Sequence, residues 1–310
     1  MGTPEFAGII LEKLIASETY KPSLVITRPD KPLGRKQILT PPPVKILAEQ
    51  HNIAVEQPEK IKNEEVIAKI KIESPDLIIV AAYGKIIPKE ILDIPRFGVL
   101  NIHASLLPLY RGASPISAAI LNADRKTGAT IMLIDEELDH GPILSQARVS
   151  IAPDDTTESL GRKMADAGAD LLFDTIPKWT SGTIKSLAQN HSRATHTKIL
   201  IKQDGEIKAE HTAGYIEKMA RAYYPWPGIY LNYELRIMNY ESEKKRLKII
   251  KTKTVRCEKN LPPLSFFVTA DKQLALQTAK DCLILETVQP ESKKPMSGYD
   301  FYLGNIDLTI

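Results

Sequence analysis

The sequence predicts an α/β protein, with a Rossmann-like, mostly parallel sheet in its first part and a smaller β-barrel at its C-terminal end. Strand-like and helix-like patterns alternate up to about residue 185, which is typical of parallel strands joined by covering helices. After residue 204, short strand-like runs follow one another without crossover helices, which favours a small OB-like barrel. We therefore expect a first domain over residues 1–185, a linker over 186–203 and a barrel domain over 204–310.

The expected elements follow from the spacing of apolar residues. In the first domain, helices are expected where apolar residues recur at helical spacing, over 5–17, 44–51, 63–73, 115–123 and 156–180. Strands are expected over the short apolar runs between them, at 23–27, 52–56, 77–82, 99–103, 129–134 and 143–149. In the barrel domain, one helix over 212–223 precedes strands over 229–239, 246–255, 264–269, 273–278 and 282–288.

The composition is that of an ordinary globular chain, with 310 residues of which 43% are hydrophobic and 25% are charged. The longest apolar run, residues 77–82, is too short to cross a bilayer, and the N-terminus lacks the basic and apolar regions of a secretory signal. We therefore expect a cytoplasmic monomer with no membrane partner. Cys257 and Cys282 are expected to be reduced thiols rather than a disulfide or a metal site.

Common cofactor motifs are missing from the sequence. It contains neither a G-x-G-x-x-G dinucleotide element nor a G-x-x-x-x-G-K-[ST] phosphate loop. Its six histidines show no metal-ligand spacing, so no metal is expected. His140 is interpreted as a loop histidine exposed to solvent.

Two expected strands end in polar residues. Asn101 and His103 stand two residues apart in the apolar run at 99–103, and therefore on one face of the strand. A second apolar run ends in a group of acids and a Gly-Pro turn that includes Asp139. We expect the two strand ends to bring Asn101, His103 and Asp139 together. The alternative is that Asn101 and His103 are only hydrogen-bonded core groups.

An amide, an imidazole and a carboxylate suit the attack of a nitrogen nucleophile on an acyl carbon. The Asn101 amide can donate an N–H to the oxygen that becomes negative in a tetrahedral intermediate. His103 can carry a proton between the incoming and the leaving nitrogen at neutral pH, and Asp139 would orient the ring and favour its protonated form. No serine or cysteine nucleophile is needed when the attacking amine is the substrate.

The run N-I-H-A-S-L-L-P-L-Y-R-G-A-S-P-I at 101–116, with L-D-H-G-P-I-L at 138–144, resembles the folate-dependent formyltransferase family. Elements at 222–228 and 289–298 extend the resemblance over nearly the whole chain. It implies a formyltransferase fold, in which the formyl group of 10-formyltetrahydrofolate passes to the α-amino group of methionine on initiator tRNA. It also implies that Asn101, His103 and Asp139 are catalytic.

The same resemblance implies a folate site. The residues that would line it are Ser105, Leu106, Leu107 and Pro108. We add Tyr83 and Gly84, because they follow the expected strand 77–82 and ligands of open α/β sheets bind at the carboxyl ends of the strands.

Residues 27–45 contain many prolines together with Gly34, so a long loop without regular structure is expected there. The segment resembles the tRNA-contacting loop of family members that act on methionyl-tRNA. The resemblance implies that Arg35 contacts the acceptor end of the tRNA, supported by Lys31 and Lys36, although Lys36 stands where the pattern has glycine. The alternative is a solvated basic connector.

A second basic segment lies in the barrel domain. The cations that alternate along this expected hairpin include Lys244, Lys245, Arg246 and Lys248. They would form a stripe able to follow the phosphates of tRNA. A solvated strand face explains the same residues equally well.

The element G-T-P-E-F-A at residues 2–7 resembles a family element that normally follows a first strand. That strand is missing here, so we expect Met1 to be an internal methionine taken as a start site, and a longer form to be more stable.

Three other functions remain open. A glycinamide ribonucleotide formyltransferase would lack the proline-rich loop and the barrel, and sugar-nucleotide N-formyltransferases usually lack the loop in this form. The third is a tRNA- or folate-binding protein made inactive by the missing strand.

Overall fold

The computed structural model describes residues 1–34, 36–236, 242–257, 261–305 and 308–309, without the side chains of 234–236, 242–244 and 308–309. The chain forms two compact units, which we treat separately. The first unit consists of Met1–Ala119, Arg125–Ala152 and Ser159–Ile199. The second consists of Ile120–Asp124, Pro153–Glu158 and Leu200–Ile310.

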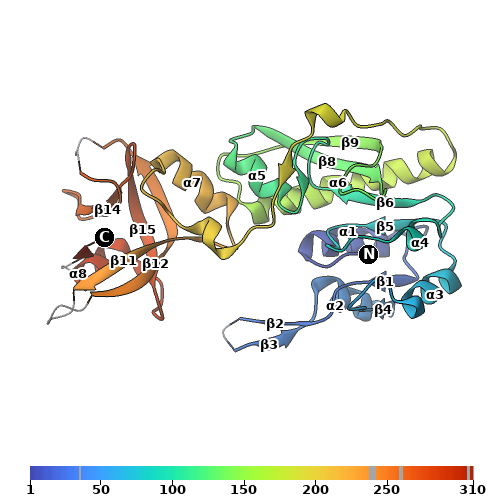
Figure 1. The fold of residues 1–310 in the computed structure, drawn as a ribbon, viewed down its shortest axis with the longest axis horizontal. Helices are drawn as coiled ribbons and strands as arrows, with labels where there is room; N and C mark the ends of the chain where they lie inside the picture. Colours follow the sequence, from blue (N-terminus) through green and yellow to red (C-terminus); the bar gives the residue numbers. More distant parts are fainter. Residues whose placement is uncertain (35, 237–241, 258–260, 306–307, 310) are drawn as a thin grey trace. The chain divides into compact units, whose positions relative to one another are not determined.

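A four-stranded sheet forms the centre of the first unit (Figure 1). Its strands, in spatial order, are β5 (Ile78–Val80), β6 (Val99–His103), β8 (Lys126–Leu133) and β9 (Ile143–Ser150). β5 and β6 run parallel, whereas β6–β8 and β8–β9 are antiparallel, so the sheet is mixed. β6 lies between two neighbours and carries Asn101 and His103 toward its carboxyl end.

A separate parallel pair is formed by β1 (Leu24–Ile26) and β4 (Ala54–Glu56). Met1 and Gly2 lie between this pair and β5: the Met1 amino group donates to the Ile79 carbonyl at 2.6 Å, and Gly2 N–H donates to the Ile26 carbonyl at 3.1 Å. A largely apolar cavity of about 380 Å³ extends from there. Burial lowers the pKa of the Met1 amino group to about 5.

Five predicted helices of the first domain are confirmed, with ends shifted by no more than two residues. They are α1 (Glu5–Ala16), α2 (Pro43–Gln50), α3 (Glu64–Glu73), α5 (Pro115–Leu121) and α6 (Thr157–Thr180). In α1, the residues at helical spacing form its buried face, which includes Ile10 and Leu14. The single-turn helix α4 (Lys89–Leu92) is too short for periodicity to reveal. Within the described ranges, no helix is both long and apolar enough to span a bilayer.

The prediction that residues 27–45 lack regular structure is wrong. β2 (Lys31–Leu33) and β3 (Ile38–Thr40) pair as a hairpin, and Figure 1 shows it extending from the first unit. Pro32 is tolerated because the hairpin has only two strands, so each strand has an edge on which a missing N–H costs no ladder bond. Gly34, with φ of 71°, supplies the backbone conformation at the turn that other residues rarely adopt.

The second unit is built on an antiparallel sheet that curls into a half-barrel, which is consistent with the expected OB-like barrel. The strand order is β13-β14-β15-β12-β11-β17, and β16 pairs with β15. The strands are β11 (Ile229–Arg236), β12 (Ser242–Val255), β13 (Phe266–Val268), β14 (Leu274–Gln277), β15 (Cys282–Pro290), β16 (Met296–Ser297) and β17 (Leu308–Thr309). The helices are α7 (Ala213–Ala222), which was predicted, and α8 (Gly298–Leu303), which was not.

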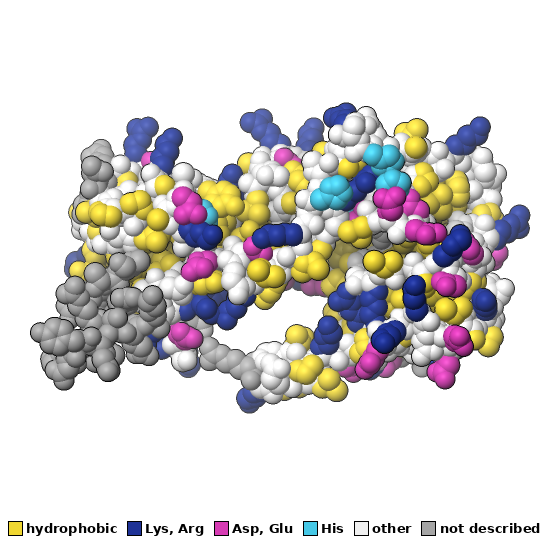
Figure 2. Space-filling model, viewed as in Figure 1, with side chains coloured by type: hydrophobic (Ala, Val, Ile, Leu, Met, Phe, Trp, Pro, Cys, Tyr) yellow, Lys and Arg dark blue, Asp and Glu magenta, His cyan; other side chains and the backbone are white. Residues whose placement is uncertain are grey.

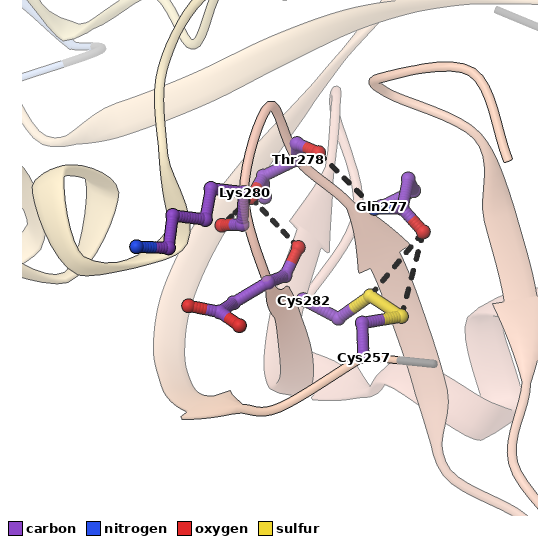
Figure 3. Close-up of a disulfide and its surroundings, with 6 residues drawn as sticks. Cys257, Gln277, Thr278, Lys280 and Cys282 are labelled. Atoms are coloured by element: carbon purple, nitrogen blue, oxygen red, sulfur yellow. Dashed lines mark hydrogen bonds between the residues drawn. A yellow bond between two sulfur atoms is a disulfide. The ribbon is translucent and has the colours of Figure 1, made fainter. Parts of the chain in front are cut away.

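The prediction of two reduced thiols is also wrong. Cys257 and Cys282 form a disulfide, with their Cα atoms 5.3 Å apart (Figure 3). The pairing of β12 with β15 sets Val255 opposite Cys282 and so brings Cys257 alongside. Two cysteines separated by 25 positions carry no local signal of this register, and the expected cytoplasmic setting argued for thiols.

Candidate active site

The candidate site lies at the carboxyl end of β6. Leu100 and Ile102 point into the core and are buried, whereas Asn101 is only half-buried. Because side chains alternate along a strand, Asn101 and His103 lie on the same face of the sheet. His103 is 6% exposed, so its ring is held by protein atoms.

The structure brings Asn101, His103 and Asp139 together, as the sequence predicts. One carboxylate oxygen of Asp139, Oδ1, lies 3.5 Å from the Asn101 amide nitrogen and 3.5 Å from His103 Nδ1. These distances are at the long end for hydrogen bonds, and such contacts often shorten only when a substrate is bound. The catalytic roles of the three residues remain predictions.

Backbone groups of residues 110–112 hold two members of this trio. The Tyr110 carbonyl lies 2.9 Å from His103 Nε2, so that nitrogen carries a hydrogen, since a carbonyl can only accept. Gly112 N–H donates to the second carboxylate oxygen of Asp139, Oδ2, at 2.7 Å. One short segment therefore orients both the imidazole and the carboxylate.

Asp139 lies in a tight turn and adopts a φ of 49°, in the left-handed region. Asp is one of the few residues that visit this region, and doing so costs of order 1–3 kcal/mol unless the surroundings hold it. Two residues later, Gly141 passes so close to the Leu133 carbonyl that a Cβ atom there would overlap it. The glycine of the 138–144 motif therefore sets the path of the turn that presents Asp139.

Gly141→Ala is accordingly expected to lower the free energy of unfolding by about 1–3 kcal/mol, because the backbone of residue 133 or 141 must move. Denaturant unfolding measures this loss. Gly8→Ala is the matched control, because an added Cβ in α1 would have only an ordinary contact at 3.8 Å with Pro43. Equal stability of the wild-type and Gly141→Ala chains would show that the turn has room the structure does not display.

The expected folate-site segment 105–108 follows β6 directly. The Ser105 hydroxyl donates to the Leu109 carbonyl at 2.6 Å, so it closes the loop internally. Thr130 Oγ1 donates to the Ser105 carbonyl at 2.6 Å and accepts from Leu107 N–H at 3.2 Å. Leu106 and Pro108 remain half-buried, so the segment presents apolar side chains rather than free polar atoms.

Tyr83 and Gly84 lie after β5, as expected, but the Tyr83 ring points into the core. It is 1% exposed, its hydroxyl has no hydrogen-bond partner among the described residues, and burial raises its pKa. What these two residues present is backbone: the carbonyls of both accept from Arg28.

The prediction that His140 is an exposed loop histidine is wrong. Its side chain is 30% exposed, and its Nδ1 lies 2.7 Å from Asp135 Oδ2. Its ring stacks on His191 with centroids 4.0 Å apart. Figure 2 shows histidine side chains beside acidic ones on this face of the first unit.

Sequence reasoning missed Gln189 and assigned no role to Arg111. Both are only 5% exposed and they bond to each other, Arg111 Nη2 donating to Gln189 Oε1 at 2.8 Å. The Tyr-Arg-Gly of the 101–116 motif was a signal for Arg111. Nothing in the local sequence pointed to Gln189, which lies in the expected linker.

The residues expected to contact tRNA lie in two places. Arg35 and the Lys244 side chain are outside the described residues. Lys31 and Lys36 are exposed on the β2–β3 hairpin.

The base of that hairpin is anchored by Asp30. A hydrogen bond from Gln57 at 2.7 Å, and an ion pair with Lys45 at 2.9 Å, hold the pKa of the Asp30 carboxyl below its usual range. The anchor comes from α2 and from the end of β4, so the start of the hairpin is fixed to the first unit.

On β12, Arg246 and Lys248 share a face with the register position of Lys244, whereas Lys245 lies on the other face. The Arg246 guanidinium carbon lies 4.4 Å from the centre of the Tyr230 ring, a cation–π arrangement. Lys248 is exposed. The expected stripe is thus divided between the two faces of the strand.

No group of three or more His, Cys, Asp or Glu side chains suited to a metal ion occurs in the part of the chain that the structure describes.

Comparisons with known proteins identify the family of the chain. A family model described as "Formyl transferase" matches residues 1–176, and one described as "Formyl transferase, C-terminal domain" matches residues 199–305. The methionyl-tRNA formyltransferase of Chloroflexus aurantiacus is 42% identical over 305 residues, which cover 98% of this chain and 95% of the relative. That of Bacillus pumilus is 40% identical over 312 residues, covering 99% of this chain and 95% of the relative.

Solved structures with a similar fold are more distant in sequence. WlaRD, a sugar 3N-formyl transferase solved in the presence of dTDP and 5-N-formyl-THF, matches with a TM-score of 0.60 at 20% identity, covering 94% of this chain and 97% of that chain. HypX from Aquifex aeolicus in complex with tetrahydrofolic acid matches with a TM-score of 0.59 at 15% identity, covering 84% of this chain and 44% of that chain. At these identities the likeness concerns the fold.

Proposed function

Since the chain belongs to the formyl transferase family, we propose that it transfers the formyl group of 10-formyltetrahydrofolate to the α-amino group of methionine on initiator tRNA. The observation that carries the proposal is the identity of about 40% to methionyl-tRNA formyltransferases over both units of the chain. The sugar N-formyltransferase neighbours support the same chemistry on another amine, but at only 20% identity.

The site geometry suits this transfer. Bound 10-formyltetrahydrofolate would supply a formyl carbon attached to nitrogen, the methionine amine is the nucleophile, and tetrahydrofolate leaves. Asn101, half-buried at the end of β6, donates an N–H to the formyl oxygen as it becomes negative. His103, between the Tyr110 carbonyl and Asp139, takes a proton from the attacking amine and returns one to the leaving nitrogen.

Binding of the two substrates is assigned to surfaces of different character. The apolar side chains of segment 105–108, whose backbone is hydrogen-bonded to Thr130, would receive the flat folate ring. The exposed backbone after β5 would contribute polar groups. Lys31, Lys36, Arg246 and Lys248 would contact tRNA phosphates. The protein would act as a monomer.

The test is a direct comparison of amine acceptors. The chain is incubated with labelled 10-formyltetrahydrofolate and, separately, methionyl-initiator tRNA, glycinamide ribonucleotide and a dTDP-amino sugar. We expect transfer to methionyl-tRNA with the highest kcat/KM. Faster transfer to either small acceptor would contradict the proposal, and tRNA binding without any transfer would favour the inactive binding protein.

A further inference from the structure

The segment after α6 returns across the candidate active site and is tied to it at both ends. We call residues 187–197 the strap. At one end, the Leu187 and Ile143 backbones exchange two hydrogen bonds of 2.8 Å. At the other, β10 (His196–Thr197) pairs in parallel with β7 (Arg111–Gly112). Both attachments lie within the first unit.

Gln189, near the start of the strap, uses both hydrogens of its side-chain amide on the turn that carries Asp139. Its Nε2 donates to the Asp139 carbonyl at 2.9 Å and to the Gly141 carbonyl at 2.7 Å. Its Oε1 accepts from Arg111 Nε at 3.3 Å and Nη2 at 2.8 Å. A buried amide with both hydrogens on one turn defines the position of that turn, and Asp139 is the residue there with the left-handed φ.

Arg111 continues the network away from Asp139. Its Nη2 lies 2.9 Å from His191 Nδ1, and because a guanidinium only donates, His191 Nδ1 is the acceptor. The His191 ring stacks on His140 with an angle of 10° between the rings, and His140 is bonded to Asp135. The strap therefore contacts the turn at residues 139, 140 and 141, through the hydrogen bonds of Gln189 and the stacking of His191 on His140.

The strap also fixes the segment that orients His103. Thr195 Oγ1 accepts from Tyr110 N–H at 2.8 Å, and the Thr195 carbonyl accepts from Arg111 N–H at 2.8 Å. Thr197 Oγ1 donates to the Arg111 carbonyl at 3.0 Å. The Tyr110 carbonyl and the Gly112 N–H are the groups that contact His103 and Asp139.

From these contacts we infer that Gln189 is a positioning residue of the transfer reaction, which acts by holding the Asp139 carboxylate against His103 and Asn101. The inference rests on the proposed function. A displacement of about 1 Å in a catalytic group can cost about 10²-fold in rate, so a residue without substrate contact can control kcat. If Gln189 had only a structural role, its substitution would lower stability. Any effect of that substitution on kcat would then be the same with and without the Asp139 carboxylate.

The test is a double-mutant cycle in the full chain, with 10-formyltetrahydrofolate and methionyl-initiator tRNA. Gln189→Leu keeps the side-chain size but removes both donors to the turn and the acceptor of Arg111. Asp139→Asn removes the charge that Gln189 is inferred to position. In the wild-type background we expect Gln189→Leu to lower kcat about 10- to 100-fold, with KM changed less than about threefold. In the Asp139→Asn background it should lower kcat by less than about threefold. Gln50→Leu, on the exposed end of α2, is the matched control.

Equal losses in the two backgrounds, or no loss in either, would overturn the inference. Thermal unfolding of each variant shows whether it is folded. If Gln189→Leu is not, Gln189→Glu takes its place, because it keeps an acceptor for Arg111 and removes both donors to the turn, and the same pattern of losses is expected. The wild-type chain separates this outcome from the function itself: if it is inactive on methionyl-tRNA, the proposed function fails, and the cycle is run with the amine it does formylate.

Discussion

Replacing His103 by alanine is expected to lower kcat for formyl transfer by about 10²- to 10⁴-fold, the usual contribution of a positioned acid–base group. The ring is buried and lies between the Tyr110 carbonyl and Asp139, so its orientation is fixed for proton transfer. The affinity for methionyl-tRNA should change little, because His103 is 6% exposed and offers no surface to a large ligand. Single-turnover transfer measures kcat, and filter binding of methionyl-tRNA measures affinity.

His51→Ala is the control for this variant, since His51 is exposed at the end of α2 in the same unit. It should retain wild-type kcat and the same affinity. Transfer at the wild-type rate by His103→Ala would mean that the proton moves through another group or through water. A loss confined to affinity would mean that His103 organises the tRNA site rather than the reaction.

Asn101→Ala is expected to lower kcat by about 10²- to 10³-fold, the cost of removing one donor to a developing oxyanion. Its amide is half-buried, so it is within reach of a substrate, while its neighbours Leu100 and Ile102 fix the strand from the other face. The loss should appear in kcat and not in the KM for either substrate, because the oxygen becomes negative only during transfer. Steady-state kinetics with each substrate varied in turn make this separation.

Asn122→Ala, at an exposed position, is the control for Asn101→Ala and should leave both constants unchanged. If Asn101→Ala raised KM for the formyl donor and left kcat intact, Asn101 would be a binding residue, and another donor would have to stabilise the oxygen.

Much of the first unit could be predicted because its signals are local. The apolar spacing in α1 and the apolar run of β6 describe faces that are buried in the structure. Asn101 and His103 could be placed on one face from the period of the strand alone. Asp139 was expected from the assumption that two strand ends meet, but β6 and β8 pair antiparallel, with Leu133 opposite Leu100 and Thr130 opposite His103. Asp139 reaches the other two residues through the turn that follows β8, where Gly112 N–H holds its carboxylate.

The features that were wrong or missed depend on partners distant in sequence. Pro32 is compatible with a strand only because that strand has a free edge, and Cys257 meets Cys282 only through the register of β12 on β15. The strap carries no apolar period, because polar bonds hold it to residues between 44 (Leu187 to Ile143) and 87 (Thr195 to Pro108) positions away. A stretch of this kind looks like a linker in sequence even when its polar groups are hydrogen-bonded to distant residues.

The strap also bears on where this chain can be divided. An excised first unit that stopped at residue 185 would contain Asn101, His103 and Asp139 but would lack Gln189, Thr195 and Thr197. The turn at Asp139 and the segment 110–112 would then keep their sequence but lose the hydrogen bonds that they make with the strap. Chimaeras that join this unit to a different C-terminal unit should therefore place the junction after Ile199, where the first compact unit ends. The boundary that matters for such an exchange thus lies beyond α6, the last α-helix of the first unit.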